Sequence, residues 1–115
     1  MTGVDIGAGA VPGPFATERT DDARGVSLAL LGELDLGSAP ELDRQLREIE
    51  RTSPERLTID LSGLRFMDST GLASIIEAQR LAEVNGHELV LRRPTSQVQR
   101  LFELTGVIDR LTFDG

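Results

Sequence analysis

The chain has 115 residues, of which 12 are basic and 19 are acidic, and its formal net charge is −7. This length fits one small domain that can bury a core without disulfides, and the chain contains no cysteine. Every basic residue is arginine, which excludes a phosphate-loop lysine, a Schiff-base lysine and a lysine general base. The acidic balance and the lack of an aromatic platform argue against a nucleic-acid partner.

The sequence shows no sign of a membrane or export segment. No apolar run approaches the ~20 residues that span a bilayer. Residues 1–5 lack the basic start and the apolar stretch of a signal peptide. We therefore expect a cytoplasmic protein with no membrane partner.

The N-terminal region divides into a tail and the start of a domain. Residues 1–14 are rich in Gly, Ala and Pro and predict a flexible tail, so that the domain covers residues 15–115. Residues 15–17 suggest a short edge strand that turns through residues 20–25. The apolar run of residues 26–31 predicts a strand buried on both faces, as in a parallel sheet.

The first helix has a recognisable start. Residues 32–35 are expected to end the preceding strand. Ser38 and Glu41 have the spacing of a capping box, in which each side chain bonds the backbone N–H of the other residue. A helix is therefore predicted from Ser38 to about Thr52, with one apolar stripe.

The rest of the chain alternates strands and helices. The pattern predicts strands at residues 57–61, 87–92 and 111–113, with Gly63 closing the first of them. Helices are predicted from Asp68 to about Val84 and from Pro94 to Gly106. This order indicates an α/β fold: a single domain with a central mixed β-sheet of mainly parallel strands and helices packed against it.

Polar residues gather where the second helix begins. Asp68, Ser69, Thr70 and Gly71 follow a strand and open a helix, which is where open α/β sheets place their sites. The free backbone N–H groups of a helix start also favour a phosphate, so Ser69 is a candidate phosphoacceptor. Alternatively, these residues only cap the helix, although one cap needs only one side chain.

The second helix carries apolar residues around most of its circumference, in the positions Leu72, Ala73, Ile75, Ile76, Ala78, Leu81, Ala82 and Val84. Either neighbouring elements cover both of its sides, or part of the surface is a contact face for another protein. The pattern leaves both interpretations open.

Several separated blocks resemble one family. The segments 57–61 and 66–72 are similar to the signature of the STAS domain family, specifically of bacterial anti-sigma factor antagonists. The Gly-Glu-Leu-Asp turn at residues 32–35 and the C-terminal positions of residues 86–106 agree with it. The resemblance covers about residues 26–113 and implies a STAS-type domain.

The resemblance implies a switch protein without catalysis, cofactor or metal. Its unmodified form would bind an anti-sigma factor that is also a serine kinase. Phosphorylation at Ser69, with Thr70 as a second candidate, would end the binding, and a phosphoserine phosphatase would restore it. Asp68 and Gly71 would support the turn. The expected partner contacts are Asp35, Met67, Asp68, Ser69, Thr70, Leu72 and Ile76, and the expected state is a monomer or weak dimer.

Other functions remain as alternatives. A scaffold or stress-sensing STAS subunit would use the same face without phosphorylation. A serine hydrolase is suggested by Ser69-Thr70-Gly71, but Met67 replaces the glycine of a nucleophile elbow. Its only imidazole base would be His87, which we expect to be a solvated residue at a strand end.

Two further groups of charged residues are given structural roles. Asp60 and Asp68 lack the ligand spacing of a metal site, and Asp60 is expected to accept hydrogen bonds at a strand end. The adjacent Arg92 and Arg93 are expected to be solvated on the surface.

Overall fold

The computed structural model describes residues 14–114. The predicted tail, residues 1–14, therefore lies outside the described residues except for Pro14. The elements in chain order are β2 (Phe15–Asp22), β3 (Gly25–Leu34), α1 (Ala39–Glu50), β4 (Arg56–Met67), α2 (Ser69–Asn85), β5 (Glu88–Arg92), α3 (Ser96–Thr105), the 3₁₀ helix η1 (Ile108–Arg110) and β6 (Phe113–Asp114).

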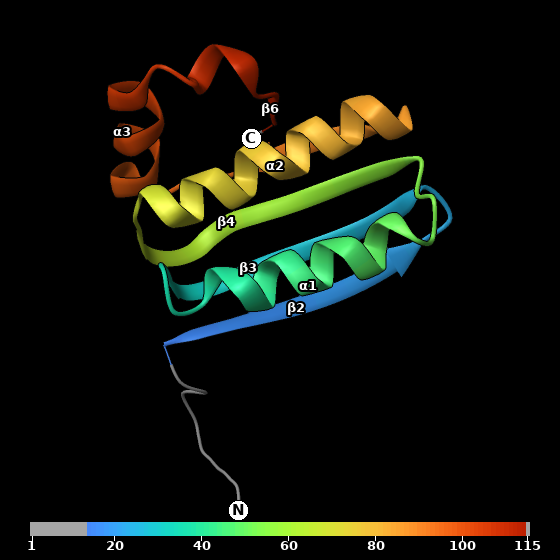
Figure 1. Cartoon of the computed structure of the whole chain (residues 1–115), viewed down its shortest axis with the longest axis horizontal. Coiled ribbons are helices and arrows are strands. Elements are labelled where there is room, and N and C mark those ends of the chain that lie inside the picture. Colours follow the sequence, from blue (N-terminus) through green and yellow to red (C-terminus); the bar gives the residue numbers. More distant parts are fainter. Residues whose placement is uncertain (1–13, 115) are drawn as a thin grey trace, which may run out of the picture.

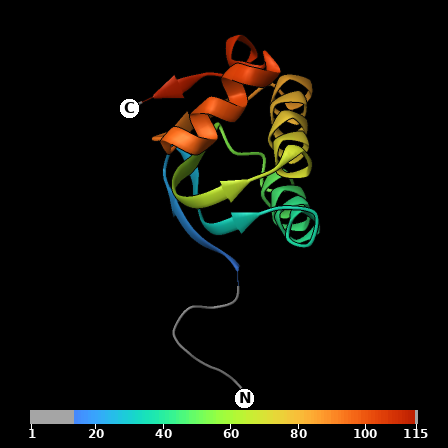
Figure 2. The same ribbon diagram turned by 90° about the vertical axis from the view of Figure 1, so that its left-hand side faces the viewer.

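The strands form one five-stranded sheet in the order β2-β3-β4-β5-β6 (Figure 1). β2 runs antiparallel to β3, and each later neighbouring pair is parallel. Figure 2 shows α1 and α2 together on one side of this sheet. The prediction of a single α/β domain with a mixed, mainly parallel sheet is confirmed.

The core lies between the sheet and the helices. Alternate residues of β3 are fully buried, among them Leu28 and Leu30, while the residues between them are half-buried. The prediction that this strand is buried on both faces is therefore wrong, because α1 and α2 cover only one side of it. β5 has the predicted character instead, since Leu89, Val90 and Leu91 are all buried.

Two strands continue past the glycines that were expected to end them. β3 runs through Gly32 to Leu34, and β4 runs through Gly63 to Met67. The register between the two strands shifts in this region, as at a β-bulge. Gly32 has φ +93°, and a Cβ there would lie 2.0 Å from the carbonyl oxygen of Pro14. Glycine serves here as a bulge residue and not as a strand end.

β2 is also longer than predicted. It pairs with β3 along its whole length, from Phe15 opposite Gly32 to Asp22 opposite Gly25. Its exposed, charged second half gave no apolar alternation from which a strand could be predicted. The additional length of this edge strand therefore comes from its pairing with β3 and not from burial of its side chains.

Ser38 does not form the predicted capping box. Its hydroxyl accepts from the backbone N–H of Asp35 at 2.9 Å and donates to the carbonyl of Glu33 at 2.9 Å. The carboxylate of Glu41 instead accepts from Arg44 and Gln45. Ser38 thus holds the β3–α1 loop closed, because the loop offers its hydroxyl a closer donor and acceptor than the helix does.

The side chain of His87 is buried, whereas the sequence predicted a solvated residue. Its side chain is 3% exposed, with Nε2 2.9 Å from Oε2 of Glu50 and Nδ1 2.8 Å from the carbonyl oxygen of Glu88. Asn85 also donates to the Glu50 carboxylate, at 2.7 Å. The α2–β5 turn therefore packs against the last residue of α1, a contact between positions 37 residues apart.

The start of α2 is packed against the end of β3. The backbone N–H of Asp68 donates to the carbonyl of Leu34 at 3.2 Å. A Cβ on Gly71 would lie 2.8 Å from that carbonyl oxygen and 2.7 Å from Cγ of Leu34. Only glycine lets the first turn of α2 approach β3 this closely.

The His87 contact predicts a large loss of stability on truncation. His87→Ala leaves the largely buried Glu50 carboxylate with Asn85 as its remaining partner, and we expect the free energy of unfolding to fall by about 2 kcal/mol. Urea unfolding followed by circular dichroism measures this. Arg80→Ala, which removes an exposed pair with Glu77, is the control and should change little. Equal losses in the two variants would contradict the interpretation.

The Gly71 contact predicts a steric effect. Gly71→Ala should displace the start of α2 and lower the free energy of unfolding by about 1–3 kcal/mol. Gly37→Ala is the matched control, because a Cβ there would make an ordinary contact of 3.5 Å with Asp35. Thermal unfolding of both variants tests the prediction, which fails if Gly71→Ala is as stable as Gly37→Ala.

Candidate functional site

The candidate site is the turn between β4 and α2. Asp68 is the N-cap of α2, and its Oδ1 accepts from the backbone N–H groups of Thr70 at 2.9 Å and Gly71 at 3.0 Å. One of the three polar residues in a row thus caps the helix, as one interpretation of the sequence held. The hydroxyls of Ser69 and Thr70 are not needed for that role.

Ser69 is accessible and unengaged. Its side chain belongs to an exposed residue, whereas Thr70 is half-buried. Within residues 14–114 the Ser69 hydroxyl forms no hydrogen bond with another residue. A modifying enzyme can therefore reach this oxygen without unfolding the turn.

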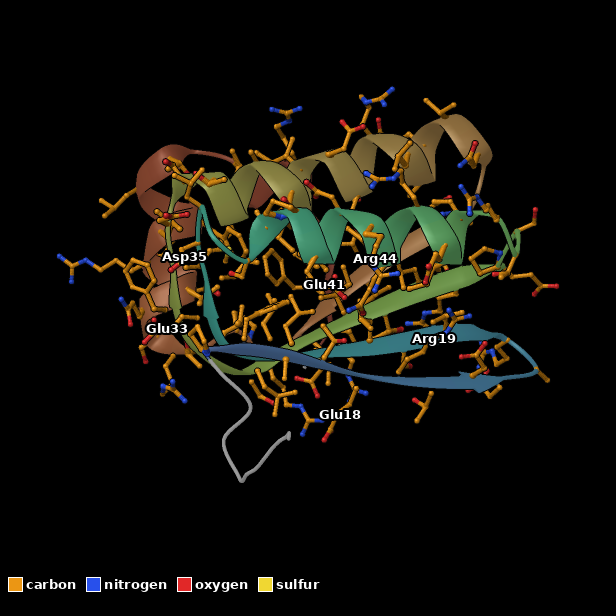
Figure 3. All side chains as sticks on the ribbon, turned by 60° about the horizontal axis from the view of Figure 1, so that its bottom comes forward. Glu18, Arg19, Glu33, Asp35, Glu41 and Arg44 are labelled. Carbon is orange, nitrogen blue, oxygen red and sulfur yellow. The ribbon has the colours of Figure 1, made fainter. Side chains whose placement is uncertain are left out.

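A groove lies beside this turn because β3 and β4 are parallel and end together, with Leu34 opposite Met67. The groove has a volume of about 610 Å³ and contains, in its wall, the residues Pro14, Phe15, Asp35, Leu36, Gly37, Ser38, Glu41 and Asp68. Figure 3 shows Glu33 and Asp35 together at this end of the sheet, with Glu41 nearby on α1.

The groove is acidic. Asp35, Glu41 and Asp68 contribute carboxylates, and no arginine among residues 14–114 lines the groove itself, although Arg44 pairs with Glu41 at 2.6 Å. The hydrogen bonds that Arg44 and Gln45 donate to Glu41 lower the pKa of its carboxyl to about 2, so Glu41 stays ionised. Oδ1 of Asp35 accepts from the backbone N–H groups of Gly37 and Ser38, which fixes the loop.

Apolar side chains accompany the carboxylates. Leu36 is 74% exposed at the edge of the groove, and Phe66 is 38% exposed beside Glu33, its partner in the sheet register. Sequence reasoning missed Leu36, Glu41 and Phe66 as site residues. The position of a leucine between Asp35 and Gly37, inside a loop, was the signal that could have indicated Leu36.

The predicted partner contacts divide into two groups. Asp35, Asp68, Ser69 and Thr70 lie at the surface of this end of the sheet. Met67 and Leu72, in contrast, are 4% and 5% exposed and belong to the core. Their side chains pack in the core beneath the turn. Only their backbone lies next to the site. Ile76 is half-buried on α2.

The apolar circumference of α2 is explained in part by packing. Leu72, Ile75, Ala78 and Ala82 are buried, and α1 packs against this helix. Val84 remains 68% exposed. The interpretation that neighbouring elements cover α2 therefore accounts for four of its eight apolar residues, while Ile76 and Leu81 are half-buried and Ala73 is exposed.

The charged residues away from the turn form ordinary contacts. Asp60 accepts from the backbone N–H of Ser62 at 2.9 Å and lies 3.4 Å from Arg93. Burial opposes ionisation of Asp60, but the bonds from Ser62 and the charges of Arg93 and Arg92 outweigh it and lower its pKa. Asp60 accepts hydrogen bonds as predicted, within β4 and not at its end, and Arg93 is paired with it.

The geometry gives no support to metal or hydrolase chemistry. Among the described residues, no group of three or more His, Asp or Glu side chains could hold a metal ion. Ser69 and His87 flank opposite ends of the 17-residue α2, about 25 Å apart at 1.5 Å per residue. His87 therefore cannot serve as a base for Ser69.

In the described part of the chain, no helix combines the length and apolarity that crossing a membrane requires.

Comparisons with known proteins agree with this fold. A family model described as "Mlab, STAS domain" matches residues 16–112. An anti-sigma-B factor antagonist of Staphylococcus aureus is 32% identical over 78 residues, covering 68% of this chain and 72% of that protein. The anti-sigma-B factor antagonist of Listeria monocytogenes is 33% identical over 88 residues, covering 76% and 77%.

Solved structures share the architecture. An anti-sigma factor antagonist from Mycobacterium paratuberculosis has a TM-score of 0.76 and 26% identity, covering 90% of this chain and 88% of that one. The Bacillus cell fate determinant SpoIIAA in its phosphorylated form has a TM-score of 0.68 and 20% identity, covering 87% and 92%. On the family match and the curated relatives together, the chain belongs to the STAS domain family.

Proposed function

We propose that this protein is an anti-sigma factor antagonist that binds a serine-kinase anti-sigma factor while Ser69 is unmodified and loses that partner when Ser69 is phosphorylated. The observation that carries the proposal is the exposed, unengaged Ser69 hydroxyl beside an acidic groove. The names of the curated relatives support the class of partner. The protein would act by binding, and a phosphatase would restore the binding-competent form.

The groove indicates the chemistry of the partner's surface. The carboxylates of Asp35 and Asp68 near an exposed leucine complement a surface with basic side chains beside an apolar pocket. If such a partner bound in the groove, Ser69 would lie against it, because Ser69 directly follows the groove residue Asp68. The complementary charges would also speed the encounter, because the whole chain carries a net charge of −7.

A phosphate would oppose this complex in two ways. It adds about −1.5 to −2 charges, from which a partner surface built around a hydroxyl must strip water. A kinase also holds nucleotide phosphates at its transfer site, and these repel the new phosphate on the substrate. Each ~1.4 kcal/mol lost is tenfold in affinity, so the phosphate can act as an off signal without refolding the domain.

Substitution of Ser69 tests the switch. Ser69→Ala should capture the kinase from cell extract and resist phosphorylation by it, whereas Ser69→Asp should bind at least tenfold more weakly because of its added charge. Calorimetry with the captured kinase and mass spectrometry after incubation with ATP measure both effects. Thr70→Ala is the control and should still gain one phosphate.

Two results would contradict the proposal. A phosphate found at another residue would refute the assignment of Ser69. Binding of the captured partner with no gain in mass would indicate instead a STAS scaffold or stress-sensing subunit that uses this face constitutively.

Two equally exposed leucines allow a matched test of the groove. Leu36 and Leu104 are both 74% exposed, but only Leu36 lines the groove. Leu36→Ala should weaken kinase binding about tenfold, because an apolar anchor at an interface centre carries much of its affinity. Leu104→Ala on α3 should leave binding unchanged, and neither variant should alter the melting temperature. Equal binding by the two variants would exclude the groove as the docking surface.

A further inference from the structure

We propose that Asp68 keeps a phosphate on Ser69 directed outward, because its carboxylate already occupies the backbone N–H groups of Thr70 and Gly71, which would otherwise bind that phosphate. Asp68 is in this sense a positioning residue for the switch. The inference rests on the proposed phosphorylation of Ser69 and adds how the phosphate is presented to a partner.

The donors that matter are the backbone N–H groups of the first helical turn. A helix start normally offers free N–H groups and the positive end of the helix dipole to an anion. In α2 the N–H of Leu72 is bonded to the carbonyl of Asp68 at 2.9 Å. Oδ1 of Asp68 accepts from both Thr70 and Gly71. A carboxylate therefore holds the place that a phosphate on the adjacent residue would take.

The surrounding charges act in the same direction. Asp68 shares the groove with Asp35 and Glu41, so a phosphate moving toward the helix start would approach several carboxylates. Arg65, the arginine that precedes the turn, lies 3.9 Å from Glu33 and is 63% exposed at its side chain. Arg44 already pairs with Glu41 at 2.6 Å, so the carboxylates of Asp35 and Asp68 are the groups that oppose a phosphate at the helix start.

This arrangement decides whether the partner must desolvate the phosphate when it binds. A phosphate that capped α2 would be partly neutralised within its own domain. The charge at the surface that meets the partner would then change less. A phosphate held in solvent must instead be desolvated by the partner. Asp68 would therefore increase the difference in affinity between the two forms of the protein.

The test uses phosphoserine inserted at position 69 during translation, so that no kinase is required. The amide resonances of Thr70 and Gly71 are followed by NMR from pH 5 to 8, across the second ionisation of the phosphate near pH 6. In the chain with Asp68 these two amides should not follow that ionisation. In Asp68→Ala they should move downfield with it, because the phosphate takes over both N–H groups.

Two further variants separate this effect from simple loss of a cap. Thr95→Ala removes the N-cap of α3, whose hydroxyl accepts from the N–H of Val98, and should leave the Thr70 and Gly71 amides unresponsive to the phosphate. Asp68→Asn keeps a neutral cap and should give an intermediate response. Asp68→Asn also decides the question if Asp68→Ala does not fold.

The outcome that overturns the inference is clear in each direction. Amides that follow the phosphate ionisation in the unsubstituted chain would show that the phosphate displaces Asp68. Amides that ignore it in both Asp68 variants would show that the phosphate does not seek these donors. Neither result depends on a partner, so failure of the proposed kinase binding would be seen separately in calorimetry. With the partner, Asp68→Ala should reduce the affinity ratio of unmodified to phosphorylated protein several-fold.

Discussion

The site depends on how the first turn of α2 is fixed to the end of β3. The N–H of Asp68 bonds the carbonyl of Leu34, and the absence of a side chain on Gly71 lets the helix approach that same carbonyl. The Asp68 side chain then closes the turn from within. Because these contacts use every neighbour of Ser69 but not Ser69 itself, the serine is presented on a rigid support.

Because this support is fixed, the proposed switch would need no rearrangement of the domain. Phosphorylation of an exposed hydroxyl on a fixed turn changes charge and hydration where a partner would dock, and the domain need not rearrange. The core beneath the turn includes Met67 and Leu72, which are buried, so the position of Ser69 is tied to the packing of the whole sheet. A partner would distinguish the two forms by the phosphate on Ser69 alone, because the surrounding surface would stay the same.

Local sequence patterns were enough to predict the class of fold and to select a candidate site. The alternation of apolar strands and amphipathic helices predicted an α/β sheet, and the turn Asp68–Gly71 was found by its position before a helix. The same patterns failed at Gly32 and Gly63, where the chain continues as strand through irregular register. A glycine signals a break in pattern, but only the neighbouring strand decides whether the break is a turn or a bulge.

The sequence by itself determined the order of elements and a run of capping residues from Asp68 to Thr70, because these follow from residues adjacent in the chain. Tertiary structure alone decided that Ser38 bonds its loop, that His87 pairs with Glu50, and that Asp35, Leu36 and Asp68 share one groove. Those contacts join segments that meet only after the parallel strands align their carboxyl ends. The residues adjacent in the chain do not show which distant side chain a given residue will contact in the fold.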